Sequence, residues 1–179
     1  MSSSNMKSRF YSLISSFLNS FNSSFKIMLQ PGSPAPDFSV QDQNGNTVSL
    51  TDFKGKKVAL FFYPKDNTPT CTEQACNLRD NIAKLRKKGI KVLGISMDSV
   101  KKHKNFEQKF SLPFPLLADV DRQLIDAYGV WGEKVLFGRK YMGIYRTTFL
   151  INEAGIIEHV IDKVAANDHA AQILTLWGL

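Results

Sequence analysis

The stretch that decides the fold is KKVALFFYPKDNTPTCTEQACNLRDNIAKLRKKGIKVLGISMD, residues Lys56–Asp98. It opens with KKVALFFYP and closes with IKVLGISMD, two nearly continuous apolar runs of the kind that form buried strands. The segment between them repeats apolar residues at helical spacing and ends at Gly89, which predicts a helix. A strand, a helix and a second strand in this order indicate an α/β fold.

The flanking segments extend this alternation. Helices are expected at residues 99–111, 120–129 and 168–179, and strands at residues 114–119, 145–152 and 156–162. Ahead of the central stretch, residues 38–50 predict two short strands around the turn signal Asn44-Gly45. The order predicts a thioredoxin-like fold, a mixed central sheet flanked by helices, with an N-terminal β-hairpin extension. Element order alone names no function.

Composition narrows the classes of function. The chain has 179 residues, of which 43% are hydrophobic and 22% charged, as in a soluble globular domain. The net charge is +7, but the basic clusters at residues 84–91 and 101–104 lack the interleaved aromatic residues of single-strand binders. We therefore expect no nucleic-acid partner. No run approaches the roughly 18 apolar residues that span a bilayer, so no stable membrane association is expected.

Residues 1–27 differ from the rest because they are Ser-rich and contain no acidic residue. Their apolar residues recur at amphipathic helical spacing, namely Phe10, Leu13, Ile14, Phe17, Leu18, Phe21 and Phe25. Three interpretations stay open: an organelle presequence, a helix that docks on a membrane or partner, and a non-native start upstream of Met28. We expect a single domain at residues 28–179. A cytoplasmic location is expected, or a mitochondrion or plastid if the first segment is a presequence.

Both cysteines of the chain, Cys71 and Cys76, lie in the central predicted helix. Four residues separate them, whereas a thioredoxin-type redox pair has two between its cysteines. No histidine stands at metal-ligand spacing from them, so no metal is expected. Cys71 falls in the first helical turn, where unpaired N–H groups and the helix dipole favour a thiolate.

Two caps fit the start of this helix. Thr70 with Glu73 forms the pattern of a capping box, and Thr68 with Pro69 at the first helical position is the other register. Either register leaves Cys71 in the first turn.

The helical rotation of about 100° per residue separates the two thiols. Cys71 points toward the apolar stripe of the helix, whereas Cys76 lies about 140° away on the polar side. In an intact helix their Cα atoms would be about 8–9 Å apart, beyond the roughly 7 Å that a disulfide can span. The two cysteines can therefore react only if the first turns unwind. The alternative is a pair of unrelated thiols, one buried and one exposed.

The pattern Pro64-x-x-x-Thr68-x-x-Cys71 resembles the active-site signature of the peroxiredoxins. The chain is similar in particular to the peroxiredoxin Q subfamily, also called bacterioferritin comigratory proteins. That similarity also rests on Cys76, on YGVWGEK (Tyr128–Lys134) and on RTTFLI (Arg146–Ile151). It covers the predicted domain and leaves out the N-terminal segment.

The resemblance implies a thiol-dependent peroxidase of antioxidant defence that reduces hydrogen peroxide and organic hydroperoxides without a cofactor. Cys71 would be the peroxidatic cysteine and Cys76 the resolving cysteine, closing an intramolecular disulfide that thioredoxin or a similar dithiol reduces. Thr68 would hydrogen-bond the thiolate and the peroxide, Pro64 would shield the sulfur, and Arg146 would stabilise negative charge on it. Intramolecular resolution needs no second subunit, so we expect a monomer and leave a dimer open.

Two positions depart from the subfamily pattern. Thr70 stands where relatives commonly have Gly, which predicts slower unwinding of the helix, and Gln74 stands where many have Glu, which predicts a modest effect. Two other functions stay open. One is a redox sensor in which oxidation unwinds the helix. The other is a protein disulfide oxidoreductase, against which the cysteine spacing argues, as does Thr147 where thioredoxins have a cis-proline.

Overall fold

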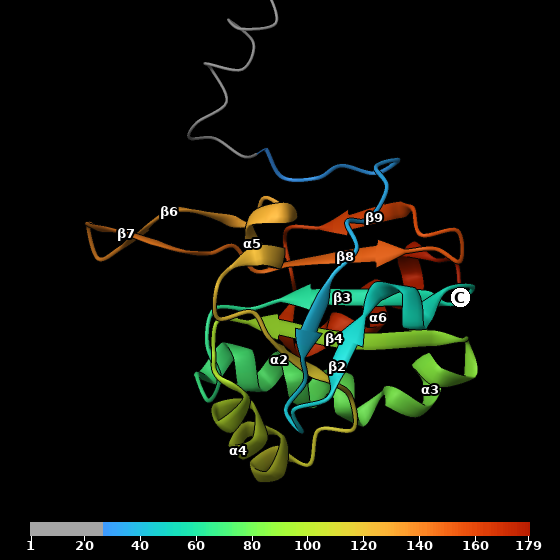
Figure 1. The fold of residues 1–179 in the computed structure, drawn as a ribbon, viewed down its shortest axis with the longest axis horizontal. Helices are drawn as coiled ribbons and strands as arrows, with labels where there is room; N and C mark the ends of the chain where they lie inside the picture. Colours follow the sequence, from blue (N-terminus) through green and yellow to red (C-terminus); the bar gives the residue numbers. More distant parts are fainter. Residues whose placement is uncertain (1–26) are drawn as a thin grey trace, which may run out of the picture.

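A computed structural model of the chain describes residues 27–179. Its centre is a sheet of strand order β5-β4-β3-β8-β9 among these residues (Figure 1). The strands are β3 (Lys57–Phe62), β4 (Ile90–Ser96), β5 (Leu116–Ala118), β8 (Thr147–Ile151) and β9 (Ile157–Ile161). The first three are parallel, β8 is antiparallel to β3, and β9 is antiparallel to β8. This confirms the predicted thioredoxin-like mixed sheet.

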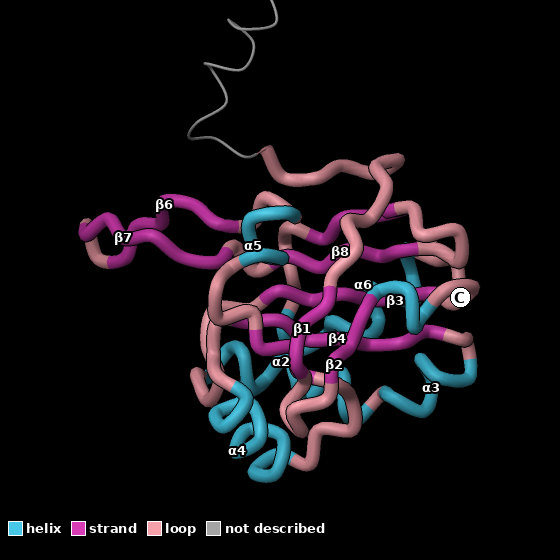
Figure 2. The backbone as a smooth tube through the Cα atoms, in the orientation of Figure 1, coloured by secondary structure: helices cyan, strands magenta, loops and turns pink. Residues whose placement is uncertain are grey.

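Helices cover one face of the sheet, and a mixture of elements covers the other (Figures 1 and 2). The first face carries α2 (Pro69–Asp80), α3 (Ile82–Lys87), α4 (Val100–Phe110) and α6 (His169–Leu176), the last preceded by η2 (Ala166–Asp168). The second face carries α5 (Gln123–Ala127), η1 (Leu50–Phe53) and the hairpin of β1 (Ser39–Gln41) and β2 (Thr47–Ser49). The hairpin extension ahead of the central sheet is thus confirmed.

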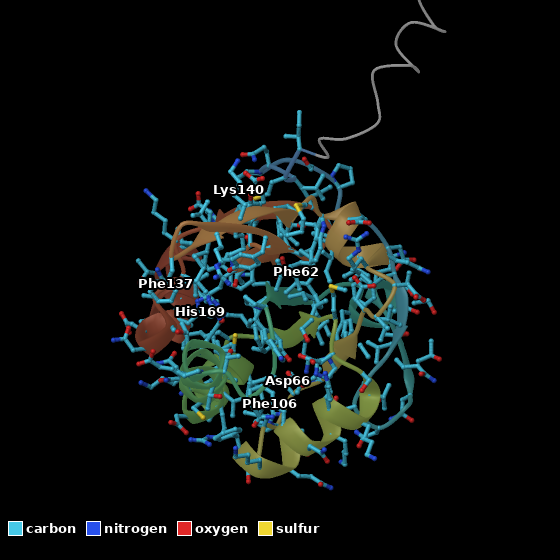
Figure 3. The ribbon with its side chains drawn as sticks, turned by 90° about the vertical axis from the view of Figure 1, so that its left-hand side faces the viewer. Phe62, Asp66, Phe106, Phe137, Lys140 and His169 are labelled. Carbon is cyan, nitrogen blue, oxygen red and sulfur yellow. The ribbon has the colours of Figure 1, made fainter. Side chains whose placement is uncertain are left out.

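The central strand β3 is buried on both sides because alternate side chains point to opposite faces. Phe61 and Tyr63 pack in the core under α2 and α4, whereas Leu60 and Phe62 pack in the core under α5. Figure 3 shows Phe62 in the interior. This double burial is the physical reason for the continuous apolar run, and it places the carboxyl end of β3 directly before the cysteine loop.

The predicted helix ending at Gly89 is not one element, which corrects the sequence-based expectation. It divides at Asn81, whose backbone leaves the helical region at φ −104° and ψ 7°. The Asn81 side-chain Nδ2 donates to the carbonyl of Asn77 at 2.9 Å. An asparagine side chain that bonds a nearby carbonyl competes with the helical backbone pattern. The cysteines therefore share a short helix, α2, that ends soon after Cys76.

A second hairpin was missing from the sequence-based prediction. It consists of β6 (Trp131–Leu136) and β7 (Arg139–Ile144), paired from Trp131↔Ile144 to Leu136↔Arg139. Most of its side chains are exposed, so the apolar and polar residues follow no burial pattern that would have predicted strands.

The N-terminal segment enters the description at Ile27. Leu29 N–H donates to the carbonyl of Tyr128 at 3.3 Å, close to the start of β6. The amphipathic segment predicted for residues 1–27 lies, but for its last residue, outside the described residues, so its role and the domain boundary at residue 28 stay predictions. Within residues 27–179, no helix combines the length and apolar character needed to cross a bilayer.

We expect the stability of the fold to fall on acidification because of His169, which docks α6 on the sheet. Its Nε2 lies 3.0 Å from Thr148 Oγ1, and it is fully buried. Burial is the main reason that the pKa of His169 is lowered to about 4. Below about pH 6.5 His169 is protonated in the unfolded chain, whereas in the folded chain it stays neutral down to about pH 4. The free energy of unfolding should therefore drop by about 2–3 kcal/mol between about pH 6.5 and pH 4.

Urea unfolding at about pH 7 and at about pH 4.5 measures this loss. His169→Gln is the matched variant, because it removes the titrating ring whatever its effect on stability at neutral pH. The difference between wild type and variant should shrink as the pH falls. An identical pH dependence in both proteins would contradict the assignment to His169.

Candidate active site

The helix that carries both cysteines begins at Pro69, with Thr68 as its N-cap at φ −81° and ψ 152°. Of the two registers that the sequence allowed, the structure has the one with Pro69 at the first helical position. Thr70 is therefore not the cap. The Thr68 hydroxyl donates to the carbonyl of Lys65 at 2.9 Å, which closes the loop ahead of the helix. Cys71 is the third residue of α2 and lies in its first turn.

The Cys71 sulfur is buried beside a cation. The side chain is 2% exposed, which confirms that it faces the body of the fold. Arg146, in the connection between β7 and β8, donates from Nη2 to Cys71 Sγ at 3.2 Å. The guanidinium places a positive charge and an N–H donor directly against the sulfur. The backbone N–H groups of the first helical turn, which have no partner within the helix, lie beside it.

Gln74 completes this arrangement and is the residue whose part sequence reasoning missed. It is fully buried, and its Oε1 accepts a hydrogen bond from Arg146 Nη1. The planar guanidinium thus holds a sulfur with one nitrogen and an amide oxygen with the other. The signal available in the sequence was the spacing: a residue three positions after Cys71 lies on the same helical face. Gln74 Nε2 has no hydrogen-bond partner among the described residues.

Pro64 and Thr68 frame the loop but do not reach the sulfur through any hydrogen bond in the structure. Pro64 directly follows β3 and Tyr63, and it is half-buried. The Thr68 hydroxyl is turned to Lys65. Their roles in shielding the sulfur and binding the peroxide therefore stay predictions.

Cys76 lies on α2 five residues after Cys71 and is half-buried, and both thiols are free. Because α2 is continuous over both, the geometry of a regular helix puts their Cα atoms about 8–9 Å apart. A disulfide needs Cα atoms no more than about 7 Å apart. The reduced helix thus keeps the two thiols separate, and part of α2 must unwind before they can bond.

A buried polar cluster fixes the loop between β3 and α2. Asp66, in the middle of the loop, accepts from the Tyr63 hydroxyl at 2.7 Å and lies 2.8 Å from His103 Nδ1 on α4. The other ring nitrogen, Nε2, lies 3.1 Å from the carbonyl of Leu117, so it carries a proton. Asp66 N–H donates to Asp98 Oδ2 at 2.8 Å. Figure 3 shows Asp66 close to α4. These bonds anchor the loop to the rest of the fold.

We expect His103→Leu to destabilise the protein by about 3–5 kcal/mol, because it leaves the buried Asp66 carboxylate without its partner. Asp66→Asn should cost far less, since an amide of the same shape can still accept from Tyr63 and keeps a polar group beside His103 Nδ1. Lys102→Ala is the control: it removes the contact of an exposed lysine with Asp98, which keeps its bonds from Asp66 N–H and the Ser96 hydroxyl, and it should cost about 1 kcal/mol at most. Thermal and urea unfolding measure all three. Equal losses for His103→Leu and Lys102→Ala would contradict the anchoring role.

Comparison with known proteins agrees with the fold. Residues 31–160 match the AhpC/TSA family. The chain is 51% identical to a putative peroxiredoxin Bcp of Coxiella burnetii over 82% of this chain and 97% of the relative. It is 49% identical to peroxiredoxin Bcp of Escherichia coli K12 over 82% of this chain and 94% of the relative.

A solved structure leads to the same family. Peroxiredoxin Q of Xanthomonas campestris superposes with a TM-score of 0.75 and 33% identity, over 85% of this chain and 96% of that chain. A second structure from that organism, described as bacterioferritin comigratory protein and linked by name to alkyl peroxide reduction, gives a TM-score of 0.75 over 85% and 97% of the chains.

A thioredoxin-like sheet with an arginine-held cysteine at the start of a helix, together with these relatives, defines the class: the chain belongs to the AhpC/TSA family. It is a peroxiredoxin, an oxidoreductase with thiol-dependent peroxidase activity. Within the class it is similar to the Bcp and peroxiredoxin Q proteins, which confirms the resemblance seen in the sequence.

Proposed function

We propose that Cys71 is the peroxidatic cysteine of this peroxidase and Cys76 its resolving cysteine. The observation that carries the proposal is the 3.2 Å contact between Arg146 Nη2 and the buried Cys71 Sγ, in the first turn of α2. A thiolate in this position is held by a cation and by backbone N–H groups, which is the environment of reactive cysteines. Cys76 lies in the middle of α2, away from its N-terminus, and no basic side chain of residues 27–179 donates a hydrogen bond to its sulfur.

The first step consumes the peroxide. The Cys71 thiolate attacks the terminal oxygen of the hydroperoxide, an S–O bond forms and the O–O bond breaks. The sulfur becomes a sulfenic acid, and the remaining alkoxide or hydroxide leaves as alcohol or water after taking a proton. Arg146 can stabilise negative charge as it moves from the sulfur to the oxygens. Thr68 and Pro64 border the loop from which the peroxide would approach.

The second step requires α2 to open. After unwinding, the Cys76 thiolate attacks the Cys71 sulfenic sulfur, the S–O bond breaks as the S–S bond forms, and the hydroxide takes up a proton and leaves as water. The anchored Asp66 is expected to stay in place, so the moving segment starts after it. The break at Asn81 ends the helix on the other side and leaves a short segment to rearrange. Thr70 keeps its predicted effect of slowing this unwinding, because a residue with a side chain is less flexible than glycine.

Thioredoxin or a similar dithiol protein is the proposed reductant, since an exposed disulfide is reduced by exchange with a dithiol. Hydrogen peroxide and organic hydroperoxides are the proposed substrates, in keeping with the alkyl peroxide activity named for the Xanthomonas relative. A monomer suffices for this cycle because both cysteines lie on one helix. The cytoplasm, with its reducing thiol systems, is the proposed location.

Cys76→Ser separates the two steps. The variant should consume one equivalent of peroxide and accumulate Cys71 with one added oxygen, seen by mass spectrometry. Its thioredoxin-driven turnover, followed as NADPH oxidation through thioredoxin reductase, should fall at least about tenfold because no internal thiol resolves the sulfenic acid. The wild type under the same peroxide should show a Cys71–Cys76 disulfide. Unchanged turnover in Cys76→Ser would show that the reductant attacks Cys71 directly.

A further inference from the structure

The β6–β7 hairpin extends away from the body of the protein at the end of the sheet where β3 leads into the cysteine loop (Figures 1 and 2). Its base is fixed: the Tyr145 hydroxyl donates to the carbonyl of Glu133 at 2.8 Å, and the Arg122 guanidinium lies 4.5 Å from the Trp131 ring centre. The outer half of the hairpin therefore projects from a base that is held by side-chain contacts.

The tip of this hairpin exposes apolar side chains. Phe137 is 96% exposed, Val135 63% and Leu136 55%. Phe137 also has a left-handed backbone, at φ 49°, next to Gly138 at φ 76°. That turn favours Asn, Asp or Gly, and a left-handed phenylalanine costs conformational energy. A large apolar residue that is both exposed and held in a backbone conformation unfavourable to it points to a function at that position.

The apolar side chains do not share one face. Directly paired residues lie on the same side of a two-stranded ribbon, and successive residues alternate. Val135 pairs with Lys140, and Leu136 with Arg139, so each face of the tip carries one apolar and one basic side chain. Phe137 occupies the turn between them. A protein partner that covers one face would leave half of these groups in water.

Basic residues surround the apolar tip. Arg139 and Lys140 lie within three positions of Phe137, with Lys140 3.0 Å from Glu133, the acidic residue of the hairpin, whereas the Lys134 ammonium donates to the Ile144 carbonyl at 3.1 Å nearer the base. The hairpin thus carries a net charge of +2, from three basic and one acidic residue. Long basic side chains keep their charge at a polar surface while their apolar stems follow neighbouring groups.

We propose that this tip, residues 135–140, inserts reversibly into the surface of an anionic lipid bilayer. Lipid surrounds an inserted tip on all sides, which suits apolar groups on both faces, and lipid phosphates suit the basic residues beside them. From Phe137 back to the Lys134–Tyr141 pair are about three strand residues, or about 10 Å. Interfacial segments bury about 5–10 Å, so Tyr141 would lie at the headgroups, where tyrosine is enriched.

The expected binding is weak, because few apolar side chains and a net charge of +2 are involved. It agrees with the expectation of no stable membrane association. It would orient the active-site end of the molecule toward the lipid surface while leaving the thiol chemistry unchanged. Such binding does not depend on which cysteine resolves the other.

Sedimentation with sucrose-loaded vesicles tests the proposal on the full chain at low ionic strength. Wild type should bind phosphatidylcholine vesicles that contain phosphatidylserine, and bind pure phosphatidylcholine at least about tenfold less. Leu136→Ser/Phe137→Ser and, separately, Arg139→Gln/Lys140→Gln should each lower binding about tenfold. The matched controls are Val120→Ser, an exposed apolar residue elsewhere, and Lys87→Gln/Lys88→Gln, the same charge change at the C-terminal end of α3. Both controls should bind like wild type.

A local readout identifies the hairpin itself. Phe137→Trp should show a blue-shifted emission with anionic vesicles and quenching by lipids brominated on the acyl chain. Tyr141→Trp should be quenched less by the same lipids, because it lies nearer the headgroups. Wild type, with Trp131 and Trp177, provides the background spectrum.

Three results would overturn the proposal. The first is a wild type that does not bind anionic vesicles. The second is tip variants that bind as well as wild type, because residues 1–26 or the rest of the domain would then be responsible for the binding. A tip variant with a raised KM for the reductant and no vesicle effect would assign the hairpin to a protein partner. Hydrogen peroxide turnover should be normal in the tip variants, which separates failure here from failure of the catalytic proposal.

Discussion

Cys71→Ser should abolish peroxide-driven turnover, lowering it at least about a thousandfold to the background of the assay. A serine hydroxyl is not ionised near neutral pH and cannot cycle through a sulfenic acid. The loss follows from chemistry rather than packing, since serine is close in size to cysteine. NADPH oxidation coupled through thioredoxin and its reductase measures turnover, and mass spectrometry of the peroxide-treated variant should find no sulfenic acid at Cys76.

The unfolding midpoint is the control for Cys71→Ser. The exchange buries a hydroxyl beside Arg146 Nη2, so the fold should stay intact, with at most a modest loss of stability. Turnover in Cys71→Ser at wild-type level would end the proposal that Cys71 attacks the peroxide. Oxidation of Cys71 in the wild type without turnover would instead favour the redox sensor that the sequence left open.

Arg146→Gln should lower the second-order rate constant for peroxide about 100-fold, the second-largest effect that we expect. Arg146 Nη2 is the charged donor at the Cys71 sulfur, and removal of one such donor commonly costs 100- to 1000-fold in rate. Arg146→Lys should lose less than Arg146→Gln, because it keeps the charge. It should still fall short of wild type, because an ammonium cannot hold both Cys71 Sγ and Gln74 Oε1 in the way that a planar guanidinium does.

Stopped-flow measurement of the first oxidation isolates this effect from resolution. Arg86→Gln is the matched control, since Arg86 on α3 donates to the carbonyl of Pro113 and does not contact the cysteines. It should keep the wild-type rate constant. If Arg146→Gln oxidises within about threefold of wild type, the short contact to the sulfur has no catalytic part, and the helix N-terminus alone activates Cys71.

Local patterns in the sequence were enough to predict the central part of the fold. The strands around Val58–Tyr63 and Ile90–Ile95 are buried on both faces, so nearly every residue in them is apolar. A continuous apolar run of this kind can be recognised in the sequence. The place of Cys71 in the first turn of a helix followed from Thr68 and Pro69, which mark a helix start by short-range geometry.

Other elements could not be predicted because no clear sequence pattern marks them. Asn81 looked like one more polar residue in a long helix, yet its side-chain bond to the Asn77 carbonyl divides that helix. The strands of the β6–β7 hairpin are exposed on both faces, so their sequence shows no alternation of apolar and polar residues that would predict a strand.

The sequence by itself determined the mixed α/β fold, the family and the two cysteines on one helix, because periodicity, caps and spacing act over a few residues. The family resemblance implied Arg146 at the sulfur, but only the tertiary structure showed how Arg146 is held there, between Cys71 and Gln74. Arg146 is 75 positions from Cys71, and His103 is 37 positions from Asp66, yet both pairs are in hydrogen-bond contact. Such contacts depend on how the sheet and helices pack, and pairwise proximity between distant residues leaves no trace in a single sequence.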